Sequence, residues 1–233
     1  MRIIAKSFIY ALISIKDQKR QILPLIIFLL LIDIIFVITN FIPILFIEIL
    51  LYIYLSAPLT VTICRNLINK TSSENELYFN LFASDYLKLY IKKFLILFLL
   101  LFSIYFVVAI VISPFLSNII ETSSLLYIGW FFILMLTYFY LRLFLVLAAA
   151  SINIDLNFIE SFKQTGPFSI QTFFQFLCLF VPYLITAFSI AYVFQDPKNF
   201  FILSILTCIL QIFGTIVHSA FLGLKYDELV KRK

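Results

Sequence analysis

The feature that most constrains this chain is a long apolar stretch, residues 22–64, whose only charged residues are Asp33 and Glu48. At a rise of 1.5 Å per residue, a single helix through this stretch would be about 65 Å long, roughly twice the thickness of a bilayer's hydrocarbon core. The polar, proline-containing segment Thr39–Pro43 lies near its middle. The stretch therefore predicts two membrane helices, joined at this segment into a hairpin.

The composition places the whole chain in the same class. Of its 233 residues, 64% are hydrophobic and 12% are charged, whereas soluble domains have roughly 45–50% apolar and about 25% charged residues. No polar segment is long enough to form a second, soluble domain. We therefore predict an integral membrane protein with a single all-α membrane domain over residues 1–233.

An amphipathic segment followed by an apolar hairpin recurs along the chain. The predicted parts are an amphipathic N-terminal segment at 1–21, hairpins at about 22–64, 94–150 and 168–224, amphipathic segments between them at 66–93 and 151–167, and a tail at 225–233. This predicts a polytopic bundle of six transmembrane helices with amphipathic helices at the cytoplasmic interface. An internal repeat would explain the recurrence, and so would the alternation common to all polytopic proteins.

The N-terminal segment has the pattern of a helix that lies in the plane of the membrane interface. Four apolar residues share one helical face: Ile4, Phe8, Leu12 and Ile15. Three lysines, Lys6, Lys16 and Lys19, lie away from that face, as in interfacial amphipathic helices. The segment 151–167 shows the same helical periodicity, carried by Ile152, Leu156, Ile159 and Phe162.

The basic residues indicate the topology. If the N-terminus is inside, all Lys and Arg residues except Lys198 fall in the inner segments, which is the bias that the positive-inside rule predicts for six crossings with both termini in the cytoplasm. Heavy use of Ile, Phe, Lys and Asn favours a bacterial source, and hence the bacterial inner (plasma) membrane. Juxtamembrane cations favour anionic lipid headgroups, so the net charge of +5 predicts a lipid partner and no nucleic acid.

Asp33 and Glu48 form a candidate intramembrane polar site. Each lies about seven residues from the turn, so both would lie about 10 Å below the outer end of the hairpin. Two acids close together in a low dielectric cannot both be ionised, so one would hold a proton and could exchange it or a cation. Alternatively, each is protonated, hydrogen-bonded to a neighbour or wetted near the headgroups.

Four further residues are candidates at the inner face. Arg142 lies near the inner end of the fourth predicted helix, where it can extend toward headgroups or pair with Asp155 or Glu160. His218 lies at a similar depth in the sixth helix. A single histidine is too little for metal or acid–base chemistry, which favours a hydrogen-bonded structural role over a catalytic one.

Glutamines lie within two of the predicted membrane helices. Gln175 and Gln211 can hydrogen-bond between helices and hold them together, or they can line a polar path.

The sequence contains no Walker-type glycine loop, no His-Glu-x-x-His and no Gly-x-Ser-x-Gly motif. Its one His and three Cys lack zinc-site spacing. We therefore predict no catalytic residues, no metal site and no cofactor.

The region from Arg142 to Gly166 resembles one bacterial family. It combines the basic residue with the small-residue run Ala148–Ala150, an acidic amphipathic segment and the sequence Ser161–Gly166. This order is similar to that in the uncharacterised six-helix inner-membrane proteins of the YciC type, and to the membrane domain fused to some glycerophosphoryl diester phosphodiesterases. The passage from Ala57 to Arg65 is also similar. The resemblance implies the fold and the location, and the family has no assigned reaction or ligand residues.

Two functions are consistent with this pattern. The first is a non-enzymatic membrane protein that organises lipid, another membrane protein or a second copy of itself, because its inner face is basic and amphipathic. The alternative is a small permease or proton-coupled transporter that uses Asp33 and Glu48. Uptake into liposomes that disappears in Asp33→Asn and Glu48→Gln variants would distinguish the second from the first.

Overall fold

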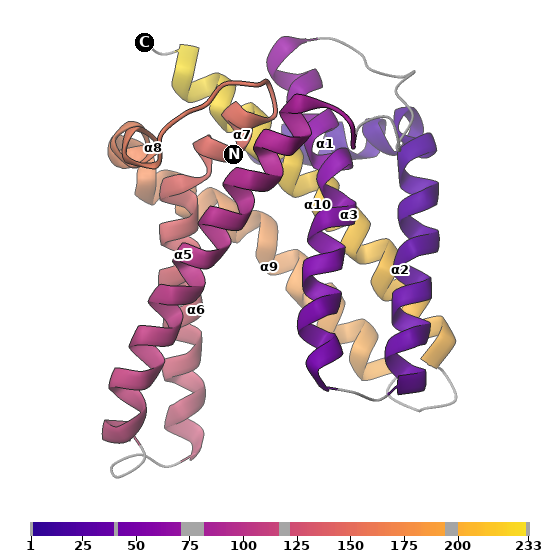
Figure 1. Ribbon diagram of the computed structural model, residues 1–233, viewed down its shortest axis with the longest axis vertical. Helices are drawn as coiled ribbons and strands as arrows, with labels where there is room; N and C mark the ends of the chain where they lie inside the picture. The colour runs from indigo at the N-terminus through magenta and orange to yellow at the C-terminus, as the bar shows by residue number, and fades with distance from the viewer. Residues whose placement is uncertain (1, 40–41, 71–81, 117–121, 194–199, 232–233) are drawn as a thin grey trace.

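The chain folds into helices over every described part with regular structure (Figure 1). The computed structural model describes residues 2–39, 42–70, 82–116, 122–193 and 200–231, without the side chains of 33–39, 42–50, 108–109, 111–116, 122–128, 130, 191, 200 and 231. The helices are α1 (Arg2–Asp17), α2 (Lys19–Thr39), α3 (Ile42–Asn69), α5 (Asp85–Leu116), α6 (Thr122–Leu143), α7 (Leu145–Ala150), α8 (Phe158–Thr165), the 3-10 turn η1 (Gly166–Phe168), α9 (Ser169–Val193) and α10 (Phe200–Lys231). The predicted all-α class is confirmed for these residues.

Four stretches of the described chain are long and apolar enough to cross a membrane. They are Leu51–Asn69 in α3, Asp85–Val107 in α5, Phe158–Ile190, which includes much of α9, and Phe201–Val230 in α10. In α6, the described apolar part is the shorter segment Phe131–Leu143. The protein is therefore a membrane protein by the length and composition of its helices, and the count of six crossings remains a prediction.

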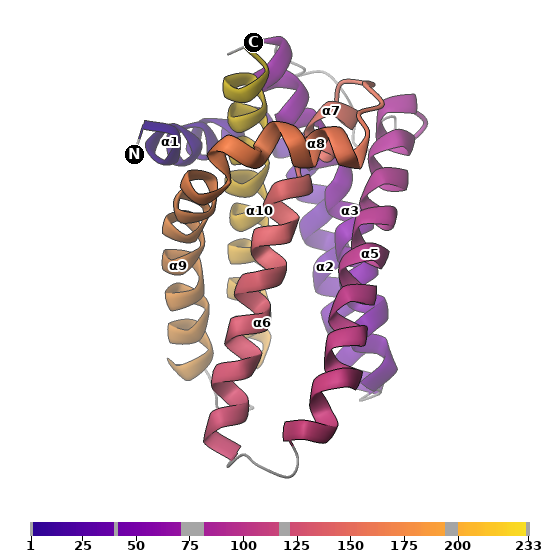
Figure 2. The same ribbon diagram turned by 90° about the vertical axis from the view of Figure 1, so that its left-hand side faces the viewer.

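The long helices run in roughly one direction, and three short elements lie at one end of them. Figure 2 shows α1 and α8 crossing this end, beside α7 and the C-terminal end of α10. In Figure 1, α5 and α6 lean away from α2, α3 and α10 toward the opposite end. Helices α1, α7 and α8 and the C-terminal end of α10 thus gather at one end of the bundle.

The hydrophobic core lies near the end that carries α1, α7 and α8. Every residue of α7 is completely buried, and Leu59 and Ile63 of α3 pack in the same cluster as Ala220 and Phe221 of α10. Backbones approach closely there, because a Cβ atom on Gly223 would lie 3.3 Å from the Cα atom of Cys64. The Cys64 thiol also donates a hydrogen bond to the carbonyl oxygen of Ser219, at 3.2 Å.

The surface of the long helices is apolar. Large side chains are more than half exposed on α5, α6 and α9, including Leu99, Phe131 and Phe188. Contiguous exposure of this kind would be costly in water, and it is the usual arrangement for side chains in contact with lipid tails. The membrane therefore covers these faces of the bundle.

The second helix of the predicted hairpin 94–150 does not continue unbroken to residue 150. Helix α6 ends at Leu143, and Phe144 separates it from α7. Hydroxyl groups of α8 bond to the carbonyl oxygen of Arg142, so this oxygen has hydrogen-bond partners outside the helix. Helix α7 is a separate, buried element that joins the core.

Helix α10 continues to Lys231, through most of the segment 225–233 that the sequence sets apart as a tail. Tyr226 and Leu229 lie at helical spacing and pack into the core. Lys225 is almost completely buried, and its ammonium group donates a hydrogen bond to a carboxylate oxygen of Glu228 at 2.7 Å. This ion pair offsets the cost of removing the ammonium group from water.

Residues 2–17 form the predicted helix α1, but its contact with the bundle uses small side chains. Ser7, Ala11 and Ser14 are buried, whereas Leu12 and Ile15 of the predicted apolar face are exposed. The three small residues recur at helical spacing, and they allow α1 to lie close to its neighbours. Ile4 and Phe8 of the same face pack against the core, so the predicted apolar face of α1 is divided between the protein and the outer surface.

The amphipathic segment 151–167 contains a shorter helix than predicted. Asn153 has a left-handed φ of 62°, which ends the turn after α7, and helix α8 begins only at Phe158. The Asn157 side chain caps it by accepting a hydrogen bond from the backbone N–H of Ile159, at 3.1 Å. Leu156 precedes this helix and packs against the core.

Replacing Gly223 by alanine is expected to separate α3 from α10, because the new Cβ would meet the backbone of Cys64 at 3.3 Å. Overpacking of this kind lowers the free energy of unfolding by about 1–3 kcal/mol. Thermal unfolding in detergent micelles measures the effect. Gly129→Ala is the matched control, since nothing lies within 4 Å of its Cβ position and alanine favours the helix by about 1 kcal/mol. Equal melting temperatures for the two variants would contradict the proposed close contact.

Candidate functional site

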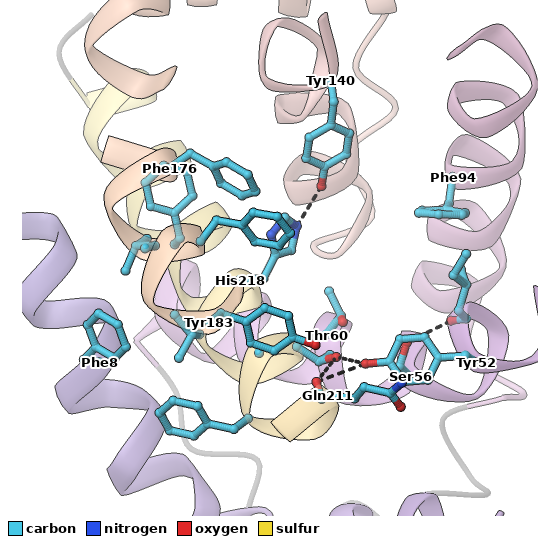
Figure 3. A pocket seen from close by; sticks show the side chains of 18 of the residues that line it. Phe8, Tyr52, Ser56, Thr60, Phe94, Tyr140, Phe176, Tyr183, Gln211 and His218 are labelled. Carbon is cyan, nitrogen blue, oxygen red and sulfur yellow. Dashed lines mark hydrogen bonds between the residues drawn. The ribbon is translucent and has the colours of Figure 1, made fainter. Parts of the chain in front are cut away.

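A cavity of about 380 Å³ lies between α3, α5, α6, α9 and α10, with Phe8 of α1 at its edge (Figure 3). Its walls come from helices that are far apart in the sequence. Figure 3 shows Tyr52, Ser56 and Gln211 on one side of the cavity, and Tyr140 with His218 on another. The polar groups are therefore arranged in two clusters.

The first cluster joins α3 to α10. The Tyr52 hydroxyl lies 3.0 Å from the backbone carbonyl oxygen of Gln211, and the Thr215 hydroxyl donates to the same oxygen at 2.9 Å. The two hydroxyl groups also contact each other. The backbone oxygen of Gln211 therefore has partners, whereas its side-chain amide has no hydrogen bond to any described residue.

The second cluster lies about 10 Å further along α10, since two turns of helix separate Gln211 from His218. His218 Nε2 and the Tyr140 hydroxyl share a hydrogen bond of 2.7 Å. The ring of Phe176 meets the imidazole edge-on, with 5.7 Å between ring centroids. His218 thus has the satisfied, structural contacts that the sequence favoured, and these contacts join α6 to α10.

Aromatic rings form much of the remaining wall. Phe176 stacks on Phe180, and Phe180 on Tyr183, with centroids 5.6 and 5.7 Å apart. Gly214 allows the Tyr183 ring to lie against α10, because a Cβ atom there would be 2.7 Å from the ring. None of the described residues that line the cavity is Asp, Glu, Lys or Arg.

Arg142 is the centre of a second polar site, at the end of the bundle that carries α8. Its guanidinium group donates to the carbonyl oxygen of Phe162 at 2.7 Å and lies 3.8 Å from the centroid of the Phe162 ring. In return, the hydroxyl groups of Ser161 and Thr165 lie 3.2 and 2.8 Å from the Arg142 carbonyl oxygen. Arg142 therefore holds α8 through a backbone oxygen and an aromatic ring, in place of the carboxylate that one interpretation of the sequence offered.

The two acidic candidates near Arg142 have other surroundings. Asp155 pairs with Lys93 of α5, whose ammonium group also donates to the carbonyl oxygen of Leu156 at 3.1 Å. The hydrogen bond and the charge of Lys93 lower the pKa of Asp155, although its carboxylate is largely exposed. Glu160 lies in the first turn of α8 and is exposed. Lys93 therefore holds the segment before α8 to α5.

The structure describes the helices that carry the predicted carboxylate pair, but not the two carboxylate side chains. Asp33 belongs to α2 and Glu48 to α3, and these two helices pack against each other. Both side chains lie outside the described residues. Among the residues that are described, no group of three or more His, Cys, Asp or Glu could hold a metal ion.

Sequence reasoning identified only part of the cavity. His218 and Gln211 were recognised as polar residues in apolar helices, but Tyr52, Tyr140 and Thr215 were not. Thr215 bonds to its own helix, as threonine commonly does, and tyrosine is common in membrane proteins, so the presence of these residues alone indicates no site. The cavity forms through contacts between distant helices, for which the linear pattern holds no signal.

No protein-family model, curated protein or solved structure matches the chain. The fold defines the class as an all-helical membrane protein with a cavity between its helices, whose described lining contains no Asp, Glu, Lys or Arg. Membership of the YciC-type family remains a prediction from the sequence.

Arg142→Gln is expected to loosen α8, because it removes a charged hydrogen bond worth about 1.5–3 kcal/mol. Hydrogen–deuterium exchange of residues 158–165 should become faster. Arg142→Lys keeps the charge but cannot both stack and bond in the same way, so it should restore only part of the protection. Lys163→Gln, which removes an exposed cation from the same helix, is the control, and exchange as fast as in Arg142→Gln would contradict the role of Arg142.

Proposed function

We propose that this chain is a non-enzymatic protein of the bacterial inner membrane, with six crossings and both termini in the cytoplasm, that binds and organises anionic lipids along its cytoplasmic face. The observation that carries the proposal is that α1 and α8 cross the same end of the bundle (Figure 2), and each exposes large apolar side chains beside lysines. The predicted alternation of the Lys and Arg residues assigns this end to the cytoplasm.

Helix α1 has a packed side and an outer side. The packed side contacts the protein, as described above. The outer side exposes large apolar side chains, namely Leu12, which is 64% exposed, Ile9 and Ile13. Lys6 and Lys16 are exposed among them. A helix at the boundary between hydrocarbon and headgroups requires this arrangement, in which apolar side chains enter the lipid and cations reach its phosphates.

Helix α8 repeats the arrangement in a shorter form. Ile159 is 63% exposed and Phe162 is 40% exposed, and Lys163 is exposed in the next position. Arg142 fixes the orientation of this helix through Phe162. The apolar side of α8 is therefore held in one position relative to the bundle, which favours a defined lipid contact over a loosely attached segment.

Removal of the lysines on these two helices is expected to reduce lipid selectivity. We expect the protein, purified in nanodiscs of mixed phosphatidylglycerol and phosphatidylcholine, to enrich the anionic lipid among the lipids that remain bound in native mass spectrometry. In the triple variant Lys6→Gln, Lys16→Gln, Lys163→Gln, the enrichment of the anionic lipid should fall roughly fivefold for each lysine removed. The reason is that each lysine near an anionic surface contributes about 1 kcal/mol to binding. Lys198→Gln is the control, because it removes the one cation predicted on the outer side.

An equal content of the two lipids around the unaltered protein would overturn the proposal. A loss of preference as large in Lys198→Gln as in the triple variant would show that only the total charge matters, and would also contradict it.

The topology predicts that Lys198 is the only lysine that an impermeant reagent can reach from outside. Spheroplasts treated with a sulfonated biotin ester should yield labelled protein, and Lys198→Arg should not be labelled unless the membrane is opened. Lys6→Arg should be labelled like the unaltered protein. Biotin on residues 1–21 in intact spheroplasts would show that the N-terminus is outside.

A further inference from the structure

We propose that the cavity between α3, α6, α9 and α10 binds an uncharged, elongated amphiphile taken from the membrane, with a hydroxyl or carbonyl head at Gln211 and an aliphatic chain along the aromatic wall. This site is separate from the basic surface proposed above, and it differs in the ligand it would accept. The cavity volume of about 380 Å³ is within the usual range for small-molecule pockets, roughly 300–1,000 Å³.

The Gln211 amide identifies the place of the polar head. Its backbone oxygen already accepts hydrogen bonds from Tyr52 and Thr215, and its side chain lies beside Ser56 and Tyr52 in the cavity (Figure 3). An amide offers two donor hydrogens and one acceptor oxygen, and this one uses none of them with a described residue. Gln211 is partly buried, and its amide borders the apolar cavity, so a ligand oxygen or hydroxyl there would supply partners that apolar side chains cannot.

The absence of charge in the wall selects against ionised heads. The described lining residues include no acidic and no basic side chain other than His218, and His218 is already bonded to Tyr140. Arg142, the nearest cation along α6, bonds to α8 instead. An ion without a partner in low dielectric costs several kcal/mol. The head is therefore neutral, in contrast to the anionic headgroups expected at the cytoplasmic face.

The geometry of the cavity favours a long ligand over a compact one. Gln211 and the Tyr140–His218 pair lie about 10 Å apart along α10, and both border the cavity. Between and around them, Phe94, Phe176 and Phe180 present apolar surface. A molecule that fills this space has a polar end and an extended apolar part, as a monoacylglycerol does.

Photolabelling of the full-length protein in phosphatidylcholine nanodiscs tests the inference. The probe is a monoacylglycerol with a diazirine in its acyl chain, and the competitors are unlabelled monoolein and oleate, which share a chain and differ in head charge. Labelling is expected on peptides of α9 and α10 that border the cavity, and monoolein should compete at least tenfold more strongly than oleate. Because these nanodiscs contain no anionic lipid, the outcome is independent of the lipid-organising function.

Two variants and one control locate the binding. Gln211→Leu keeps the size of the side chain and removes the amide, so the apparent affinity should fall roughly tenfold, as for the loss of one well-placed hydrogen bond. Gln175→Leu makes the same change on α9, outside the lining residues, and should leave labelling unchanged. Ser56→Leu fills the cavity with a larger side chain, and should reduce labelling even if Gln211→Leu fails to fold.

Three results would overturn the inference. They are competition by oleate as strong as that by monoolein, labelling spread evenly over the lipid-facing helices without competition, and equal effects of Gln211→Leu and Gln175→Leu. Each of these would mean that the cavity holds water or bulk lipid and selects no uncharged amphiphile.

Discussion

The packing of α3 against α10 is the contact on which the rest of the molecule depends. Gly223 brings the two backbones together beside Cys64, and the Cys64 thiol bonds to the Ser219 carbonyl oxygen at 3.2 Å. Toward the other end, Tyr52 and Gln211 join the same two helices. Helices α1, α2, α7 and α9 all pack on α10. Helices α5 and α6 lean away from this central pair (Figure 1), and the cavity has polar groups from α3, α6 and α10 in its lining.

The overall class of the fold was predictable because the bilayer sets the length of an apolar helix. The break at Phe144 was not predictable, because apolar residues continue from Leu143 to Ala150, and the bonds that mark the end of α6 come from Ser161 and Thr165, far along the chain. The sequence left open how far the last helix extends. The ion pair of Lys225 with Glu228 permits it to continue past Leu224 in contact with the core.

For the candidate site too, the sequence identifies some residues, whereas others become apparent only from contacts between distant helices. A glutamine or histidine in an apolar helix is conspicuous, so Gln211 and His218 could be identified from the sequence. Their partners, Tyr52 and Tyr140, belong to residue types that are common in membrane helices, and they became informative only when α3 and α6 were placed beside α10. Arg142 was a candidate from the sequence, but its acceptor is a backbone oxygen, and a residue pattern contains no information on which backbone groups are bonded.

The order of the helices along the chain has a consequence for biosynthesis. Helices α1, α2 and α3 are made before α10, yet each packs against it. Helices α2 and α3 can pair with each other early, but until Phe200–Lys231 has been inserted, Cys64 and Tyr52 of α3 lack their hydrogen-bond partners on α10. The core around α10 therefore closes only after this helix has been made. A nascent chain that stalls before α10 would consequently be exposed to membrane proteases as an incomplete bundle.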